Sequence, residues 1–130
     1  MDIILSIKPK FIEEIVAGRK KFEFRKKSFK KDVCKVYVYA SSPICRIVGE
    51  FTIGAILEGN PDAIWSQTSN KAGITKEYFD KYYDRRDLAY AIEIKSFRHY
   101  KDPIDPYRVI NRFTPPQSFC YVQEDIIVAK

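Results

Sequence analysis

The sequence predicts a single α+β domain whose mainly antiparallel sheet curls into a small barrel. Short segments with the two-residue alternation of strands recur along all 130 residues, and stretches with helical spacing interrupt them. Gly49 and Gly54 fall inside the strand expected over 47–57, where they indicate bulges or a bend of the kind that curves a strand around a barrel. The length fits one domain over residues 1–130, and 45% hydrophobic residues suffice for a core.

Three elements are expected to open the chain: a strand over 3–7, a helix over 9–17 and a strand over 22–26. Apolar residues at offsets 0, 1, 4 and 5 give the helix one apolar face, and Gly18 stands at its expected C-terminal end. Alternation along the second strand sends its two phenylalanines toward a core. Lys21, Glu23 and Arg25 then share the opposite face.

The later elements follow from the same patterns. Further strands are expected over 33–40, 47–57, 88–97, 119–122 and 126–128, the first of them half buried. Helical segments are expected after Asn60-Pro61 and after Thr75, which have the composition of N-caps. The second segment carries four aromatic residues that we expect in the core, Tyr78, Phe79, Tyr82 and Tyr83. Four prolines break residues 102–116, which predicts a long loop.

Positive charge is concentrated in one stretch. The chain carries 23 Lys and Arg against 17 Asp and Glu, a net charge of +6, and residues 19–31 hold eight basic residues against one glutamate. Such a segment attracts polyanions through phosphate contacts, which favours a nucleic acid as the partner. The expected phosphate contacts are Lys21, Lys26, Lys27, Lys30 and Lys31. The alternative is a solvated basic face that only keeps the protein soluble.

Other classes of protein receive little support from the sequence. Cys34, Cys45 and Cys120 are odd in number and widely spaced, so we expect neither a disulfide framework nor a zinc site, and no other metal or cofactor. No phosphate-binding glycine motif or serine-hydrolase motif is present. No apolar stretch approaches the roughly 20 residues of a membrane span. We therefore expect a cytoplasmic protein without membrane association.

The residues after the first helix resemble a known family signature. Gly18, Lys20, Glu23 and Arg25 match the GxKxxExR pattern of ASCH domains without a gap, and residues 39–43 and 48–51 resemble the strand ends of small stand-alone members. This resemblance implies the PUA-like fold, a small β-barrel with flanking helices and a cleft between them. It also implies binding of RNA or a modified nucleotide in that cleft, because relatives bind RNA or read modified bases.

Some small ASCH proteins are amidohydrolases that act on N4-acetylcytidine, which the resemblance offers as an alternative function. Lys20 matches their catalytic lysine, whereas Glu23 stands where they have a threonine and residues 71–73 lack their acidic residue. If the chain is a hydrolase of nucleosides or RNA, an amidohydrolase or a nuclease, Lys20 and Glu23 are the expected catalytic residues. Glu58 is a further candidate for the carboxylate.

The expected ligand-binding residues are Lys20, Glu23, Arg25, Ser41 and Ser42. Charged Lys20 and Arg25 would donate to phosphates or carbonyls, while Glu23 would orient them or accept from a base. Whether the pKa of Lys20 is raised or lowered stays open, because burial and a nearby carboxylate act in opposite directions.

Further possibilities concern the same residues and their neighbours. One alternative is that a Glu23 pair with Arg25 or Lys20 only holds the helix against the barrel. The third hypothesis, besides RNA binding and hydrolysis, is a structural or regulatory partner of another protein whose cleft has lost any ligand. Tyr37 and Tyr39 can stack bases or lie in the sheet. Residues 115–119 are expected to form a rigid rim that offers Gln117 and Ser118 to a ligand.

Overall fold

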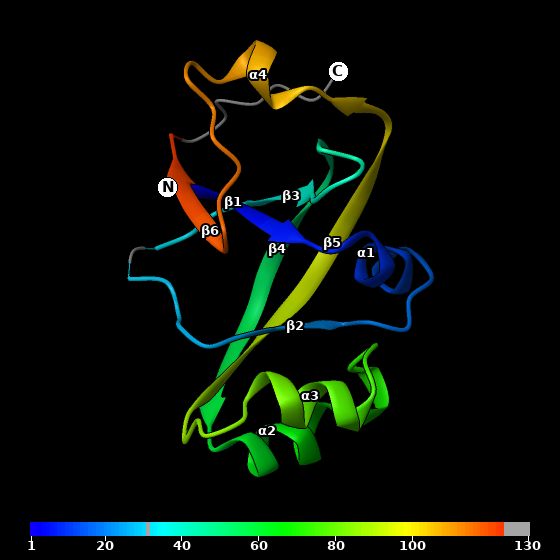
Figure 1. The fold of residues 1–130 in the computed structure, drawn as a ribbon, viewed down its shortest axis with the longest axis vertical. Coiled ribbons are helices and arrows are strands. Elements are labelled where there is room, and N and C mark those ends of the chain that lie inside the picture. Colours follow the sequence, from blue (N-terminus) through cyan, green and yellow to red (C-terminus); the bar gives the residue numbers. More distant parts are fainter. Residues whose placement is uncertain (31, 124–130) are drawn as a thin grey trace.

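The computed structural model describes residues 1–30 and 32–123 (Figure 1). Its strands are β1 (Asp2–Ile7), β2 (Phe22–Arg25), β3 (Val36–Ala40), β4 (Arg46–Gly59), β5 (Ala89–Ile104) and β6 (Phe119–Val122). Its helices are α1 (Pro9–Val16), α2 (Pro61–Thr68), α3 (Lys76–Tyr82) and α4 (Pro106–Val109), with a 3-10 turn, η1, at Ser69–Lys71. None of the helices in these residues is long and apolar enough to cross a membrane.

One six-stranded sheet, in the order β2-β5-β4-β3-β1-β6, organises the chain. The pair β1–β3 is parallel, and the other four pairs are antiparallel. The long strands β4 and β5 cross the whole molecule, and register shifts near Gly49 and Gly54 interrupt their pairing. Such irregularities bend and twist a strand, so the sheet curls into a half-barrel whose edges are β2 and β6. The α+β class and the mainly antiparallel sheet are confirmed.

The helix boundaries follow from local chemistry. Gly18, at a φ of +80°, takes the left-handed conformation that ends α1. The side chain of Asn60 accepts a hydrogen bond from the Ala63 N–H at 2.9 Å and caps α2. Thr75 caps α3 in the same way, accepting from the Tyr78 N–H at 3.1 Å. The residue that ends α1 and the residues that cap α2 and α3 are therefore the ones predicted from the sequence.

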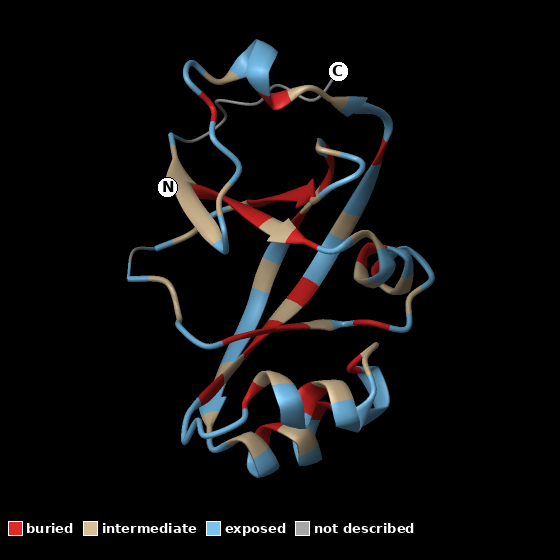
Figure 2. Cartoon of the chain, viewed as in Figure 1, coloured by how far each residue is buried: buried red, intermediate tan, exposed pale blue. Residues whose placement is uncertain are grey.

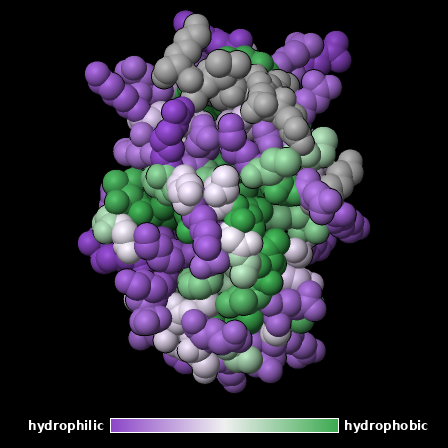
Figure 3. Space-filling model, turned by 180° about the vertical axis from the view of Figure 1, so that it is seen from behind, coloured by the Kyte–Doolittle hydropathy of each residue, from purple (hydrophilic) through white to green (hydrophobic). Residues whose placement is uncertain are grey.

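Three hydrophobic clusters hold these elements together. The largest lies between the sheet and α1, a second surrounds Tyr37, Tyr39 and Ile47, and the third joins α2 and α3 to β2 and β5 around Phe79. Figure 2 shows buried residues along β1 and β3 and on the inner sides of α2 and α3. Seen from behind, hydrophobic residues gather across the middle of the molecule, with hydrophilic residues along its margins (Figure 3).

The prediction for the third strand is wrong in part. The third strand begins at Val36 and all its residues are buried, because its valines enter the cluster against α1 while Tyr37 and Tyr39 enter the second cluster. Alternation predicted a half-buried strand, but both faces of β3 are covered. The predicted strand over 126–128 lies outside the described residues.

The predicted loop over 102–116 is also wrong at its start, because β5 continues to Ile104 and α4 follows it. Pro103 lies between the ladder pairs formed by His99 and Ile104, where register is irregular and a missing N–H costs no regular ladder bond. Pro106 occupies the first turn of α4, and Asp105 caps that helix by accepting from the Tyr107 N–H at 3.0 Å. In this segment Pro103 is tolerated within β5 and Pro106 begins a helix.

Candidate nucleic-acid interface

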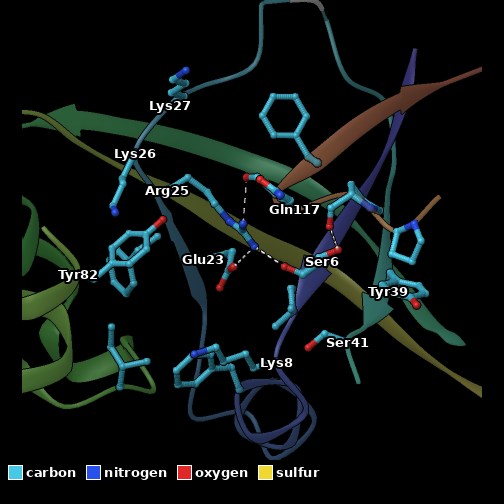
Figure 4. Close-up of a pocket in the computed structure, with 18 of the residues that line it drawn as sticks. Ser6, Lys8, Glu23, Arg25, Lys26, Lys27, Tyr39, Ser41, Tyr82 and Gln117 are labelled. Atoms are coloured by element: carbon cyan, nitrogen blue, oxygen red, sulfur yellow. Dashed lines mark hydrogen bonds and ion pairs between the residues drawn. The ribbon is translucent and has the colours of Figure 1, made fainter. Parts of the chain in front are cut away.

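A cleft of about 850 Å³ opens between the half-barrel and the helices (Figure 4). Its walls come from the end of β1, from α1, from β2, from the turn after β3, from α3 and from residues 115–119. These segments are distant in sequence and meet because the curled sheet brings its edge strand β2 opposite β1 and β6. The cleft is therefore a product of sheet curvature.

The three charged groups of the signature converge on the floor of this cleft. The Glu23 carboxylate accepts a hydrogen bond from Arg25 Nη2 at 2.5 Å, and its other oxygen lies 3.6 Å from Lys20 Nζ. Lys20, Glu23 and Arg25 are 1%, 6% and 9% exposed. Alternation along β2 places Glu23 and Arg25 on one face, as the sequence predicted. Lys20, Glu23 and Arg25 thus form an ion triad that is almost fully excluded from solvent at the base of the cleft.

Arg25 also connects the two edges of the half-barrel. Its Nη2 donates to the Ser6 carbonyl at 2.7 Å, and its Nη1 donates to Ser118 Oγ at 3.1 Å. Ser6 belongs to β1, and Ser118 directly precedes β6. Arg25 Nε is buried and has no hydrogen-bond partner among the described residues. The Arg25 side chain therefore links β2 to β1 and to the residue before β6 by hydrogen bonds.

Lys20 is held by several contacts at once. Its Nζ donates to the Ala72 carbonyl at 3.0 Å and lies 4.9 Å from the centre of the Phe24 ring. Gly73, at a φ of +66°, packs so closely on the lysine that an added Cβ would lie 2.9 Å from Lys20 Cα. Burial lowers the pKa of Lys20, and the Glu23 carboxylate opposes that shift without cancelling it. The structure thereby gives the direction that sequence left open.

The aromatic residues of α3 and of its C-cap, Tyr83, divide between core and cleft. Phe79 and Tyr83 are buried in the third cluster, as predicted, whereas Tyr78 and Tyr82 line the cleft. Lys26 Nζ lies 4.6 Å from the centre of the Tyr82 ring, and the two side chains face each other in Figure 4. The prediction of four core aromatics is therefore wrong for Tyr78 and holds in part for Tyr82, which packs against the third cluster and also lines the cleft. Helical spacing does not show how far a side chain at the edge of the apolar face is covered.

The opposite wall carries small polar groups. Ser41, Ser42, Gln117 and Ser118 all line the cleft, so the strand end and the rim lie where the sequence placed them. Tyr39 lines this wall and lies across the cleft from Tyr82 in Figure 4. Tyr37 is 0% exposed and belongs to the core, which excludes it from base stacking.

The predicted phosphate contacts are split by the fold. Lys26 and Lys27 line the cleft, whereas Lys21 and Lys30 are exposed outside its lining, and Lys31 lies outside the described residues. Glu58 is exposed at the end of β4 and does not line the cleft. Residues 1–30 and 32–123 hold no group of three or more side chains suited to a metal ion.

Sequence reasoning missed two cationic residues of the cleft, Lys8 and Arg86. Lys8 directly precedes α1, and Arg86 follows α3, so no local pattern links either residue to the signature. With them, the lining contains six basic residues (Lys8, Lys20, Arg25, Lys26, Lys27 and Arg86) and one acidic residue, Glu23. The cleft is thus strongly electropositive.

Comparisons with known proteins agree with this architecture. The family described as "Domain of unknown function (DUF365)" matches residues 1–113. An "ASCH domain-containing ribonuclease" of Zymomonas mobilis is 24% identical over 127 residues, covering 95% of this chain and 86% of that protein. A large ribosomal subunit protein uL22 of Ureaplasma parvum is 33% identical over 91 residues, which are 70% of this chain and 29% of that protein.

Solved structures give the same result for the fold. The crystal structure of ASCH from Zymomonas mobilis superposes with a TM-score of 0.87 at 23% identity, covering 96% of this chain and 90% of that chain. The N-terminal domain of Staphylothermus marinus McrB superposes with a TM-score of 0.60 at 12% identity, covering 94% and 88%. The resemblance to ASCH domains and the predicted PUA-like fold are therefore confirmed.

Proposed function

Because the chain belongs to the DUF365 family and has the ASCH fold, we propose that it binds single-stranded RNA in the cleft. The observation that carries this proposal is the composition of the lining, with six basic residues, one acidic residue and the half-buried rings of Tyr78 and Tyr82. Cationic grooves with aromatic side chains bind single strands by contacting phosphates and stacking bases.

The positions of these groups favour a division of roles. Lys26, Lys27 and Arg86 are exposed, so each can reach a phosphate without leaving a buried partner. Tyr82 lies beside Lys26 and offers a ring on which a base can stack. Ser41, Ser42 and Gln117 supply donors and acceptors for base edges on the other wall. A relative named as a ribonuclease adds support for RNA as the ligand.

Fluorescence anisotropy with a labelled single-stranded oligoribonucleotide tests this proposal. Lys27→Gln should weaken binding and make the dependence of log Kd on log salt shallower by about 0.7, the value for one phosphate contact on a single strand. Lys30→Gln is the matched control, since Lys30 is exposed but lies outside the cleft. Equal effects of the two substitutions, or binding that does not respond to salt, would contradict the cleft as the RNA site.

Hydrolysis of RNA or of a modified nucleoside is the second candidate, and the state of Lys20 favours it. Its lowered pKa makes a neutral amine more accessible for proton abstraction or nucleophilic attack. Arg25, next to it on the floor, is suited to stabilise developing negative charge on a phosphate or an amide carbonyl.

Incubation of the purified protein with oligoribonucleotides and with N4-acetylcytidine distinguishes cleavage from binding alone. Cleavage predicts product that disappears in Lys20→Met, with thermal unfolding measured in parallel to verify that the variant is folded. If RNA is bound but neither substrate is converted, the protein is a binding module.

A further inference from the structure

A surface tyrosine stands beyond one end of the cleft. Tyr107, in the short helix α4, is 57% exposed. Its ring packs edge-on against Phe113 with 5.1 Å between centroids, and Phe113 in turn packs against Tyr39 at 5.5 Å. Tyr39 is part of the cleft wall. A continuous row of aromatic side chains therefore runs from the cleft to α4, and its last member presents its ring to solvent.

The same surface is positively charged. Arg46 lies opposite Ala40 of β3 in the sheet. The next residue, Ile47, lies opposite Ile104 of β5, so Arg46 is beside the segment that leads into α4. Arg108 is 86% exposed on α4. It forms an ion pair with Asp105, whose carboxylate lies 3.9 Å from Arg108 Nε. This side of the molecule thus carries two exposed guanidinium groups, Arg46 at the start of β4 and Arg108 next to Tyr107 on α4.

This surface is continuous with the cleft at the wall away from α3. Ser41, Ser42 and Cys45 line that end of the cleft, and Arg46 follows them directly in the chain. Figure 1 shows α4 on the opposite side of the molecule from α3. Electrostatic influence of Tyr107 on Tyr39 contributes to raising the pKa of Tyr39, which agrees with the proximity of the two phenol groups.

We infer that an RNA strand held in the cleft continues past the turn after β3 and stacks a base on Tyr107, while Arg46 and Arg108 contact its phosphates. This extended track rests on the proposed function, because the cleft must hold RNA for the strand to continue. An exposed aromatic ring backed by packed rings, with cations beside it, has the composition of single-strand binding surfaces. The occupant is RNA because the charge complements phosphates and because the surface continues the cleft.

The test measures by fluorescence anisotropy how tightly the protein binds oligouridylates of about four and about twelve nucleotides. Both lengths lie within the range that small single-strand binding folds cover. Tyr107→Ala should weaken binding of the longer strand about 5- to 150-fold, the change that corresponds to loss of one stacked base. Binding of the shorter strand, which the cleft holds alone, should not change. Tyr107→Phe keeps the ring and should keep the affinity.

Charge is tested separately on the longer strand. Arg108→Gln should make its salt dependence shallower by about 0.7, whereas Lys95→Gln, an exposed lysine of β5 outside the track, should leave it unchanged.

If Lys27→Gln weakens binding but Tyr107→Ala does not affect the longer strand, the track is refuted while the cleft site stands. That result would leave the surface around Tyr107 to a protein partner. If neither oligonucleotide binds, both the proposed function and the track fail.

Discussion

Replacing Glu23 by glutamine tests whether the ion triad at the cleft floor holds the fold together. The change keeps the shape of the side chain and an oxygen that accepts from Arg25, but it removes the only carboxylate that lines the cleft among the described residues. Lys20 and Arg25 would then be two buried cations with no carboxylate beside them among the described residues that line the cleft. Since Glu23 is the strongest influence that raises the pKa of Lys20, the substitution should also lower that pKa further.

The expected magnitude follows from burial. The side chains of the Lys20–Glu23 pair are 1% and 8% exposed, and Arg25 is 11% exposed. Breaking a buried ion pair by removing one partner costs about 3–5 kcal/mol, and the retained hydrogen bond places glutamine near the lower end. The exposed pair of Glu14 and Arg19, with the same 2.5 Å contact, is 29% and 65% exposed. Water screens that pair, so Glu14→Gln should change stability far less.

Urea unfolding, followed by the fluorescence of the single tryptophan, measures the difference. Trp65 lies 4.9 Å from the Phe79 ring in the third cluster, so its emission should report loss of that packing. With m values of about 1–3 kcal/mol/M, a loss of about 3 kcal/mol lowers the midpoint by roughly 1–3 M. A midpoint shift for Glu23→Gln no larger than that for Glu14→Gln would refute the reasoning that burial makes the triad structurally important.

Three further predictions concern stability. Gly73→Ala should lower the free energy of unfolding in urea by about 1–3 kcal/mol more than Gly18→Ala. Both glycines have positive φ, but only at position 73 would the added Cβ press against Lys20. Equal losses would show that the lysine can move aside. Asn60→Ala should destabilise by about 0.5–2 kcal/mol through loss of the α2 cap, measured as a shift in thermal unfolding, and an unchanged midpoint would show that the cap is dispensable. Burial raises the pKa of Tyr39 from 10.0 to about 12, so its stabilising contribution is complete below pH 10 and is lost as the pH rises through 12. Unfolding at pH 9 and pH 12 should therefore show Tyr39→Phe losing less stability than the original protein, by on the order of 2 kcal/mol, and parallel losses would contradict that shift.

Local signals in the sequence predicted what depends on neighbouring residues. Gly18 ends α1, Asn60 and Thr75 cap their helices, and β6 has the predicted bounds. Alternation along β2 correctly placed the carboxylate and guanidinium groups of the signature on one face. Each of these features needs information from only a few consecutive residues, because capping and pleating act over that distance.

Other features could not be predicted because they depend on which elements pack together. Nothing in the sequence near Tyr37 and Tyr39 shows that both are buried in the second cluster and that Tyr39 also lines the cleft. The position of Pro103 in an irregular part of β5 depends on the register with β4. Tertiary contacts also decided that Tyr82 faces the cleft.

The sequence by itself determined the family signature, the excess of positive charge and most of the secondary structure, since these are properties of residue identity and short-range geometry. The tertiary structure decided which cations face one another. Curling of the sheet carries Lys8 and Arg86 to the same cleft as Lys26 and leaves Lys21 and Lys30 outside it. Burial then sets the chemistry of the floor, because removing Lys20 from water lowers its pKa despite the adjacent Glu23 carboxylate.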